Sequence, residues 1–177
     1  MKGQKAGRIG IVVADESLRA AQRVNGKLVT AGVPIGKDFK KSLRQLLTSS
    51  PFVGRDVAVG LEGSSVLIES LVIPAGSSKS ARAVCAERLK GDPVFHEEAA
   101  VLGVAVGQPS GSSGPSMVIL AAVDKQRIGM VMAACRELEL RVHAVEAAAL
   151  AAWRSWDAEG LQVRLMRTRE GAGGVGG

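Results

Sequence analysis

The sequence feature that most constrains this chain is Asn25-Gly26, which stands between two extended apolar runs. An Asn-Gly pair fits the tight turn of a β-hairpin, where the central residues need positive φ angles. Ile9, Ile11 and Val13 alternate with other residues before the hairpin, which is the period of a strand. The sequence therefore predicts three antiparallel strands, over residues 8–14, 17–24 and 27–33.

A helix is predicted to follow the hairpin. Asp38 is a plausible N-cap, and the pattern ends at Ser49-Ser50-Pro51. The apolar residues between them recur at helical spacing: Phe39, Leu43, Leu46 and Leu47. We expect this helix to pack on one face of the hairpin sheet, and a fourth strand to follow over residues 56–61.

The pattern changes at Ser64, where a second unit begins. A strand is predicted over residues 66–73, and Ser78 is expected to cap the helix that follows. One face of that helix is apolar: Ala81, Val84, Cys85 and Leu89.

The second unit continues with two strands, over residues 99–106 and 117–123, joined by the polar loop 108–115. Asp124 is expected to cap a second helix, and residues 140–145 to form a closing strand. The apolar stripe of this helix comprises Ile128, Val131, Met132, Cys135 and Leu138. The predicted order is β-α-β-β-α-β, the ferredoxin-like arrangement.

These predictions divide the chain into four parts. The expected fold class is α/β, more specifically α+β. Residues 1–63 form a sheet with one helix, residues 64–146 an inserted β-α-β-β-α-β subdomain, residues 147–167 a returning helix and strand, and residues 168–177 a flexible glycine-rich tail. The returning helix, residues 147–156, is apolar on nearly every side, which is typical of a helix buried between two layers.

Composition narrows the class of protein. The 177 residues are 46% hydrophobic, enough for a buried core, but include only three Phe, two Trp and no Tyr. Few aromatic side chains are thus available to stack on bases. Two cysteines cannot form a disulfide framework, and neither a membrane-spanning run nor a signal peptide is recognised. We expect a cytoplasmic protein.

The net charge of +6 arises in residues 1–63, which hold eleven Lys and Arg against five Asp and Glu. A basic cluster on the first predicted helix comprises Lys37, Lys40, Lys41 and Arg44. Such a cluster is usually a solvated helix face, although it could also contact nucleic acid, an anionic membrane surface or an acidic partner.

Phosphate-binding and catalytic motifs are weak. Gly36-Lys37 is followed by Asp38, so it is no Walker A loop. Residues 60–65 could donate N–H groups to an anion, but a tight turn is the simpler interpretation. Asp15 and Glu16 are expected to satisfy local N–H groups rather than to share a proton.

The histidines and cysteines suggest structural roles. His96 lacks the second helical histidine of a metalloprotease, and His143 is predicted on another strand. Cys85 and Cys135 lie on apolar stripes, where a thiol behaves as a small hydrophobe. The sequence predicts no catalytic residue, no cofactor and no metal ligand, and it does not identify the residues that bind a partner.

Several passages nevertheless occur in a characteristic order: Ile9-Gly10-Ile11, Val57-Ala-Val-Gly-Leu-Glu-Gly-Ser-Ser-Val66, Leu71-Val-Ile-Pro74, Asp92-Pro-Val-Phe95, Val118-Ile-Leu-Ala-Ala-Val123 and Leu138-Glu-Leu-Arg-Val-His-Ala-Val-Glu146. Over about residues 8–157 this order resembles the type IV pilus assembly protein PilM family, a relative of FtsA in the actin-like ATPase superfamily. The resemblance implies an incomplete actin-like, ribonuclease H-like subdomain with an inserted subdomain.

The chain departs from that family at its first phosphate loop. The family has an acid, a glycine, two small polar residues and a lysine, where this chain has Val12, Ala14, Asp15-Glu16 and Arg19. An acidic loop would repel a phosphate. The second phosphate loop of the family belongs to a half that this sequence does not include. We therefore expect no nucleotide hydrolysis.

The resemblance implies a non-enzymatic adaptor of type IV pilus or type II secretion assembly, which binds the cytoplasmic tail of an inner-membrane partner beside the inserted subdomain. It would lie in the cytoplasm or peripheral to the inner membrane and meet the membrane only through its partner; self-association is left open. One alternative is a degenerate actin-like ATPase or phosphotransferase fragment that needs a second chain. Another, less favoured, is a small basic nucleic-acid-binding module.

Overall fold

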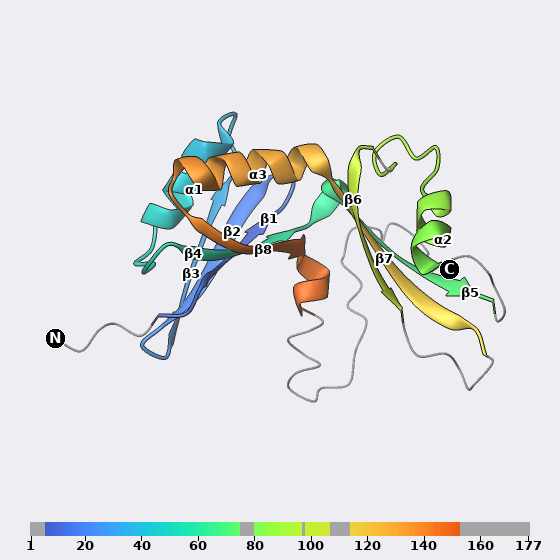
Figure 1. Cartoon of the computed structure of the whole chain (residues 1–177). Helices are drawn as coiled ribbons and strands as arrows, with labels where there is room; N and C mark the ends of the chain where they lie inside the picture. Colours follow the sequence, from blue (N-terminus) through green and yellow to red (C-terminus); the bar gives the residue numbers. More distant parts are fainter. Residues whose placement is uncertain (1–5, 75–79, 97, 107–113, 153–177) are drawn as a thin grey trace, which may run out of the picture.

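The computed structural model describes residues 6–74, 80–96, 98–106 and 114–152, and these form two β-sheets at different ends of the molecule (Figure 1). The larger sheet has five strands in the order β3-β2-β1-β4-β8, and the smaller has three in the order β5-β7-β6. The mixed α/β class predicted from the sequence is confirmed.

The hairpin prediction is also confirmed. β1 (Ile9–Val13), β2 (Ser17–Val24) and β3 (Lys27–Pro34) form an antiparallel meander. Asn25 and Gly26 have φ angles of 50° and 83°, the positive values that a tight hairpin turn requires. On the other side of β1, β4 (Asp56–Leu61) and β8 (Arg141–Ala147) continue the sheet in parallel.

Two helices cover one face of the five-stranded sheet. α1 (Phe39–Thr48) begins at Asp38, whose side chain accepts a 3.0 Å hydrogen bond from the Lys41 N–H, and α3 (Lys125–Glu137) begins at Asp124. Both predicted N-caps are confirmed. The helices and the sheet share one core, whose fully buried members include Ile9, Ile11, Leu18, Leu43, Leu46, Val57, Leu61 and Val131.

A short 3-10 turn, η1 (Gly63–Ser65), leads from β4 into the smaller sheet. This sheet consists of β5 (Val66–Ile73), β6 (Ala100–Val106) and β7 (Ser116–Asp124), and α2 (Ala81–Arg88) packs on one of its faces. The N-cap of α2 is Ser80, not Ser78 as predicted, because the Ser80 hydroxyl accepts the Ala83 N–H. Ser78 itself lies outside the described residues.

The predicted β-α-β-β-α-β subdomain is wrong in its last two elements. β8 pairs with β4 in the larger sheet, and the buried face of α3 belongs to the core of that sheet. The inserted unit is therefore β5-α2-β6-β7, and the chain returns to the larger sheet with α3. α3 and β8 begin and end close to the predicted residues. The spacing of their apolar residues, however, does not indicate which of the two sheets they join.

The predicted returning helix is described only at its start. Ala147 is the last residue of β8, residues 148–152 are helical, and none of these five is buried, so this part does not show the burial expected between two layers. The rest of the helix, the predicted strand in residues 147–167 and the tail 168–177 fall outside the described part, as does most of the loop 108–115. Among the residues described, no helix is long and apolar enough to cross a membrane.

Gln22 provides a test of the larger sheet. It is only 2% exposed, donates hydrogen bonds of 2.7 Å to the Gly7 and Val53 carbonyls, and accepts one of 2.8 Å from the Val53 N–H. Gln22→Ala removes a buried amide and its three hydrogen bonds to the Gly7 and Val53 backbone, so we expect urea denaturation to show a loss of about 2–4 kcal/mol in the free energy of unfolding. The exposed control Gln45→Ala should change it by less than about 0.5 kcal/mol; equal losses would contradict the account.

Candidate partner-binding surface

The smaller sheet has one face that no described element covers. Leu67, Leu71, Val118 and Leu120 point to the side on which α2 packs. α2 lies on the side of this sheet away from the larger sheet (Figure 1). Because side chains alternate along a strand, the intervening residues point to the opposite side.

We call this opposite side the open face. It consists of Ile68, Ser70 and Val72 of β5, Val101, Gly103 and Ala105 of β6, and Met117, Ile119 and Ala121 of β7. Strand pairing aligns them in rows across the sheet, with Ile68 opposite Ala121 and Val72 opposite Met117. Gly103 lies opposite Ala121 on the other side of β7.

The open face is mainly apolar and mostly accessible, although Ala121 is buried. Val72 is 66% exposed, Met117 58%, Val101 48% and Ile68 39%, and none of the nine residues is charged. An antiparallel sheet with one solvated face normally places polar residues on that face. A contiguous exposed apolar patch on a protein is typical of an interaction site.

Sequence reasoning missed these residues, although a signal was present. β5 and β7 are apolar at nearly every position, which predicts strands buried on both faces. Since α3 packs on the larger sheet, only α2 remains to cover the smaller one.

The junction between the two sheets is held by Asp15. Its carboxylate accepts hydrogen bonds from the Ser64 backbone N–H at 2.9 and 3.1 Å and from the Ser64 hydroxyl at 2.9 Å. Residues 60–65 thus form a tight turn, and Ser64 in this turn also donates hydrogen bonds to an anion. That anion is the Asp15 carboxylate of the same chain. Asp15 and Glu16 were expected to satisfy local N–H groups, whereas the Asp15 partner is distant in sequence.

Gly63 is the residue that lets Asp15 approach. Its φ angle is 84°, and a Cβ atom at this position would lie 2.5 Å from a carboxylate oxygen of Asp15. Any larger residue would therefore strain the backbone and displace the carboxylate.

Two arginines add to the junction. Arg19 of β2 forms an ion pair with Glu62, which directly follows β4, and Arg127 of α3 donates a 2.6 Å hydrogen bond to the Ala14 carbonyl. Around residues 14–19 this chain therefore has hydrogen bonds and an ion pair to its own residues.

The basic cluster of α1 is partly neutralised. Lys40 pairs with Glu137 of α3, and the Lys41 ammonium lies 3.8 Å from the Asp38 carboxylate. Lys37 and Arg44 are exposed. The cluster is thus mainly a solvated helix face that also joins α1 to α3.

His143 lies in β8, and His96 lies in the loop between α2 and β6. The His143 Nε2 lies 2.7 Å from Asp56, and this hydrogen bond, with Arg141 nearby, lowers the pKa of Asp56. His96 is half-buried after α2. No group of three or more His, Cys, Asp or Glu side chains that could hold a metal occurs in the part of the chain that the structure describes.

Both cysteines are buried, as predicted. Burial raises the pKa of Cys135 to about 11, and burial, followed by the nearby Glu69 charge, raises that of Cys85. Neither thiol is in the electropositive, partly exposed setting of a reactive cysteine.

Comparison with known proteins identifies the fold. No family model matches the chain, and no curated protein matches it. Among solved structures it is similar to a "PilM-PilN type IV pilus biogenesis complex", with a TM-score of 0.63 and 16% identity over 86% of this chain. It is also similar to the cytoplasmic domain of EpsL, an inner membrane component of the type II secretion system of Vibrio cholerae, with a TM-score of 0.57 and 14% identity over 83% of this chain.

These likenesses show that the two-sheet fold matches the actin-like domains of PilM and EpsL. The chain covers 50% of the first structure and 59% of the second, so it spans little more than half of the proteins it resembles.

A double-mutant cycle tests the junction. Gly63→Ala should cost backbone strain and the Asp15 hydrogen bonds together, about 2–3 kcal/mol in the free energy of unfolding. In an Asp15→Ala background, where those bonds are already absent, the same change should cost only the strain, about 1 kcal/mol.

Gly54→Ala is the matched control, because Gly54 has a φ of 83° and nothing within 4 Å of an added Cβ. It should cost about 1 kcal/mol in both backgrounds. Additive costs for Gly63→Ala and Asp15→Ala would refute the role of the carboxylate.

Proposed function

We propose that this chain is a non-enzymatic adaptor of a type IV pilus or type II secretion assembly, and that its open face binds the cytoplasmic segment of an inner-membrane partner. It would act in the cytoplasm, peripheral to the inner membrane. The observation that carries the proposal is the uncharged, exposed sheet face on a fold that also occurs in the PilM-PilN complex and in cytoplasmic EpsL.

The chemistry of the open face defines what it would bind. Branched and thioether side chains without charge favour an apolar segment, and the exposed small residues Gly103 and Ala105 leave room for bulky side chains of the partner. Hydrophobic burial supplies affinity without demanding a specific hydrogen-bond pattern. An apolar segment with few charges is the class of partner that fits.

The absence of nucleotide hydrolysis is part of the same proposal. It is supported by Asp15, which lies in the stretch that resembles the family's first phosphate loop and whose carboxylate already occupies the Ser64 backbone N–H. A second anion placed there would meet this carboxylate at close range. The alternative of a degenerate ATPase or phosphotransferase fragment requires Asp15 to move away.

Partner binding can be measured with a fluorescent peptide that carries the N-terminal cytoplasmic segment of the chain's cognate inner-membrane pilus or secretion protein. We expect a dissociation constant of about tens of micromolar or lower. Val72→Glu and Met117→Glu place a charge in the proposed contact and should each weaken binding by at least about tenfold.

Val94→Glu is the matched control, since Val94 is also an exposed valine but lies outside the open face. It should leave the affinity within about twofold of wild type, as expected for a surface change away from the contact. Equal losses in all three variants, or no binding at all, would contradict the proposal. The open face could instead bind a second copy of this chain. Sedimentation velocity of the free chain tests this alternative, because the wild-type chain would then form a dimer that Val72→Glu abolishes.

Calorimetric titration with ATP and magnesium tests the non-enzymatic part. We expect no heat of binding from the full chain, because Asp15 opposes phosphate at the turn. Saturable magnesium-dependent binding that survives in the wild-type chain would favour the ATPase fragment instead.

A further inference from the structure

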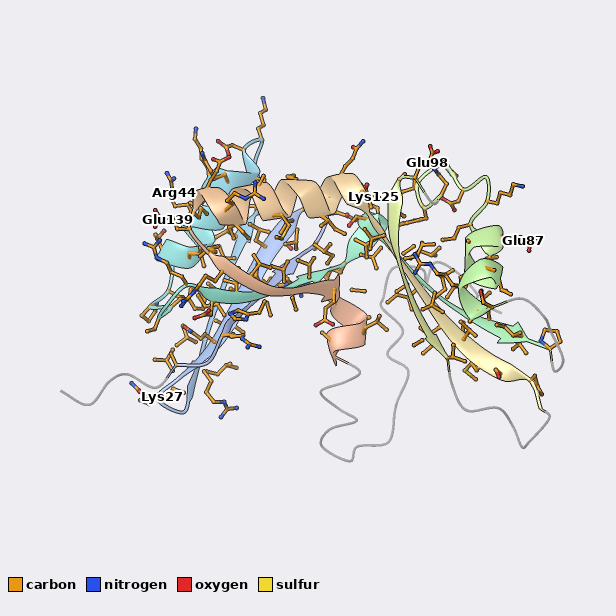
Figure 2. The ribbon with its side chains drawn as sticks, viewed as in Figure 1. Lys27, Arg44, Glu87, Glu98, Lys125 and Glu139 are labelled. Carbon is orange, nitrogen blue, oxygen red and sulfur yellow. The ribbon has the colours of Figure 1, made fainter. Side chains whose placement is uncertain are left out.

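All five strands of the larger sheet carry a cation at the end away from the smaller sheet. We call this set the cationic edge: Lys27 and Arg23 of the β2–β3 hairpin, Arg8 directly before β1, Arg55 directly before β4, and Arg141 of β8. Figure 2 shows Lys27 at the tip of the hairpin, at the opposite end of the molecule from the smaller sheet. With strands about 4.8 Å apart, the row extends over roughly 19 Å.

The negative charges at this edge are already engaged. Asp56 accepts a 2.8 Å hydrogen bond from Arg141 and lies 2.7 Å from His143, and Glu139 pairs with Arg55. Among the described residues, Arg8, Arg23 and Lys27 form no ion pair, although Arg23 reaches the Gly26 carbonyl. Three neighbouring strands therefore present cations that lack a counter-charge.

Leu28 lies among these cations and is 67% exposed. It follows Lys27 in the chain and pairs with Arg23 across the hairpin. A flat row of cations with a protruding aliphatic side chain is the combination found on membrane surfaces, where headgroups attract the charges and the apolar group enters the boundary of the acyl chains. A nucleic-acid backbone would gain nothing from Leu28.

We propose that the cationic edge and Leu28 dock on an anionic phospholipid bilayer. Each cation near such a surface contributes about fivefold in binding, so Arg8, Arg23 and Lys27 together favour an anionic over a neutral surface by about a hundredfold. This contact is weak alone, and its strength adds to partner binding at the open face when both occur on one membrane. It is carried by different residues from the proposed function and is tested separately.

The test uses the full chain and no partner. Co-sedimentation should show binding to vesicles of phosphatidylglycerol and phosphatidylcholine, but not to vesicles of phosphatidylcholine alone. The double variant Arg23→Glu with Lys27→Glu should weaken binding by at least tenfold, and Leu28→Ser should weaken it severalfold. All three residues are exposed, so these variants should retain the wild-type unfolding curve.

The matched control is Lys37→Glu with Arg44→Glu, which changes the net charge by the same amount on the α1 side. It should retain most of the binding. The proposal is overturned if both double variants lose binding equally, if Leu28→Ser has no effect, or if the wild-type chain ignores anionic vesicles. Binding to duplex DNA with a steep salt dependence, in place of vesicle binding, would also overturn it and would favour the nucleic-acid module.

Discussion

The position of the smaller sheet depends on how the chain leaves the larger one. β4 lies in the middle of a parallel set with β1 and β8 and ends at Leu61, after which the backbone turns through Glu62 and Gly63 into β5. The Asp15 carboxylate holds this turn through Ser64, and only glycine leaves space for it. α3 then brings the chain back and joins the core of the larger sheet. The same contact places a carboxylate at the junction between the two sheets.

This arrangement separates two surfaces of opposite chemistry. The open face carries no charge and is mainly apolar, and α2 is the described helix that packs on the other face of this sheet, while α3 belongs to the core of the larger sheet. The cationic edge lies at the other end, where strand termini bring together arginines and a lysine that are scattered in sequence. An adaptor that holds an apolar protein segment and touches a membrane needs both kinds of surface. Neither requires a bound nucleotide.

Local sequence patterns predicted most helices and strands, but not which elements that are distant in the sequence pack together. Asn25-Gly26 and the caps Asp38 and Asp124 act within a few residues, and each was confirmed. The pairing of β8 with β4 joins residues about eighty positions apart, and an apolar stripe such as that of α3 fits either sheet. The Asp15 contact with Ser64 is equally non-local, so the sequence did not predict that this side chain links the two sheets. The open face could have been found from β5 and β7, whose apolar residues fill both faces of each strand.

The central claim is that a partner segment docks on the open face. Hydrogen-deuterium exchange of the full chain, with and without the cytoplasmic segment of its cognate inner-membrane partner, tests this most directly. The account predicts slower amide exchange in β5, β6 and β7 when the segment is bound, with α1 and the β2–β3 hairpin unchanged. Protection confined to α1 or to the hairpin, in a sample where the segment is bound, would contradict it.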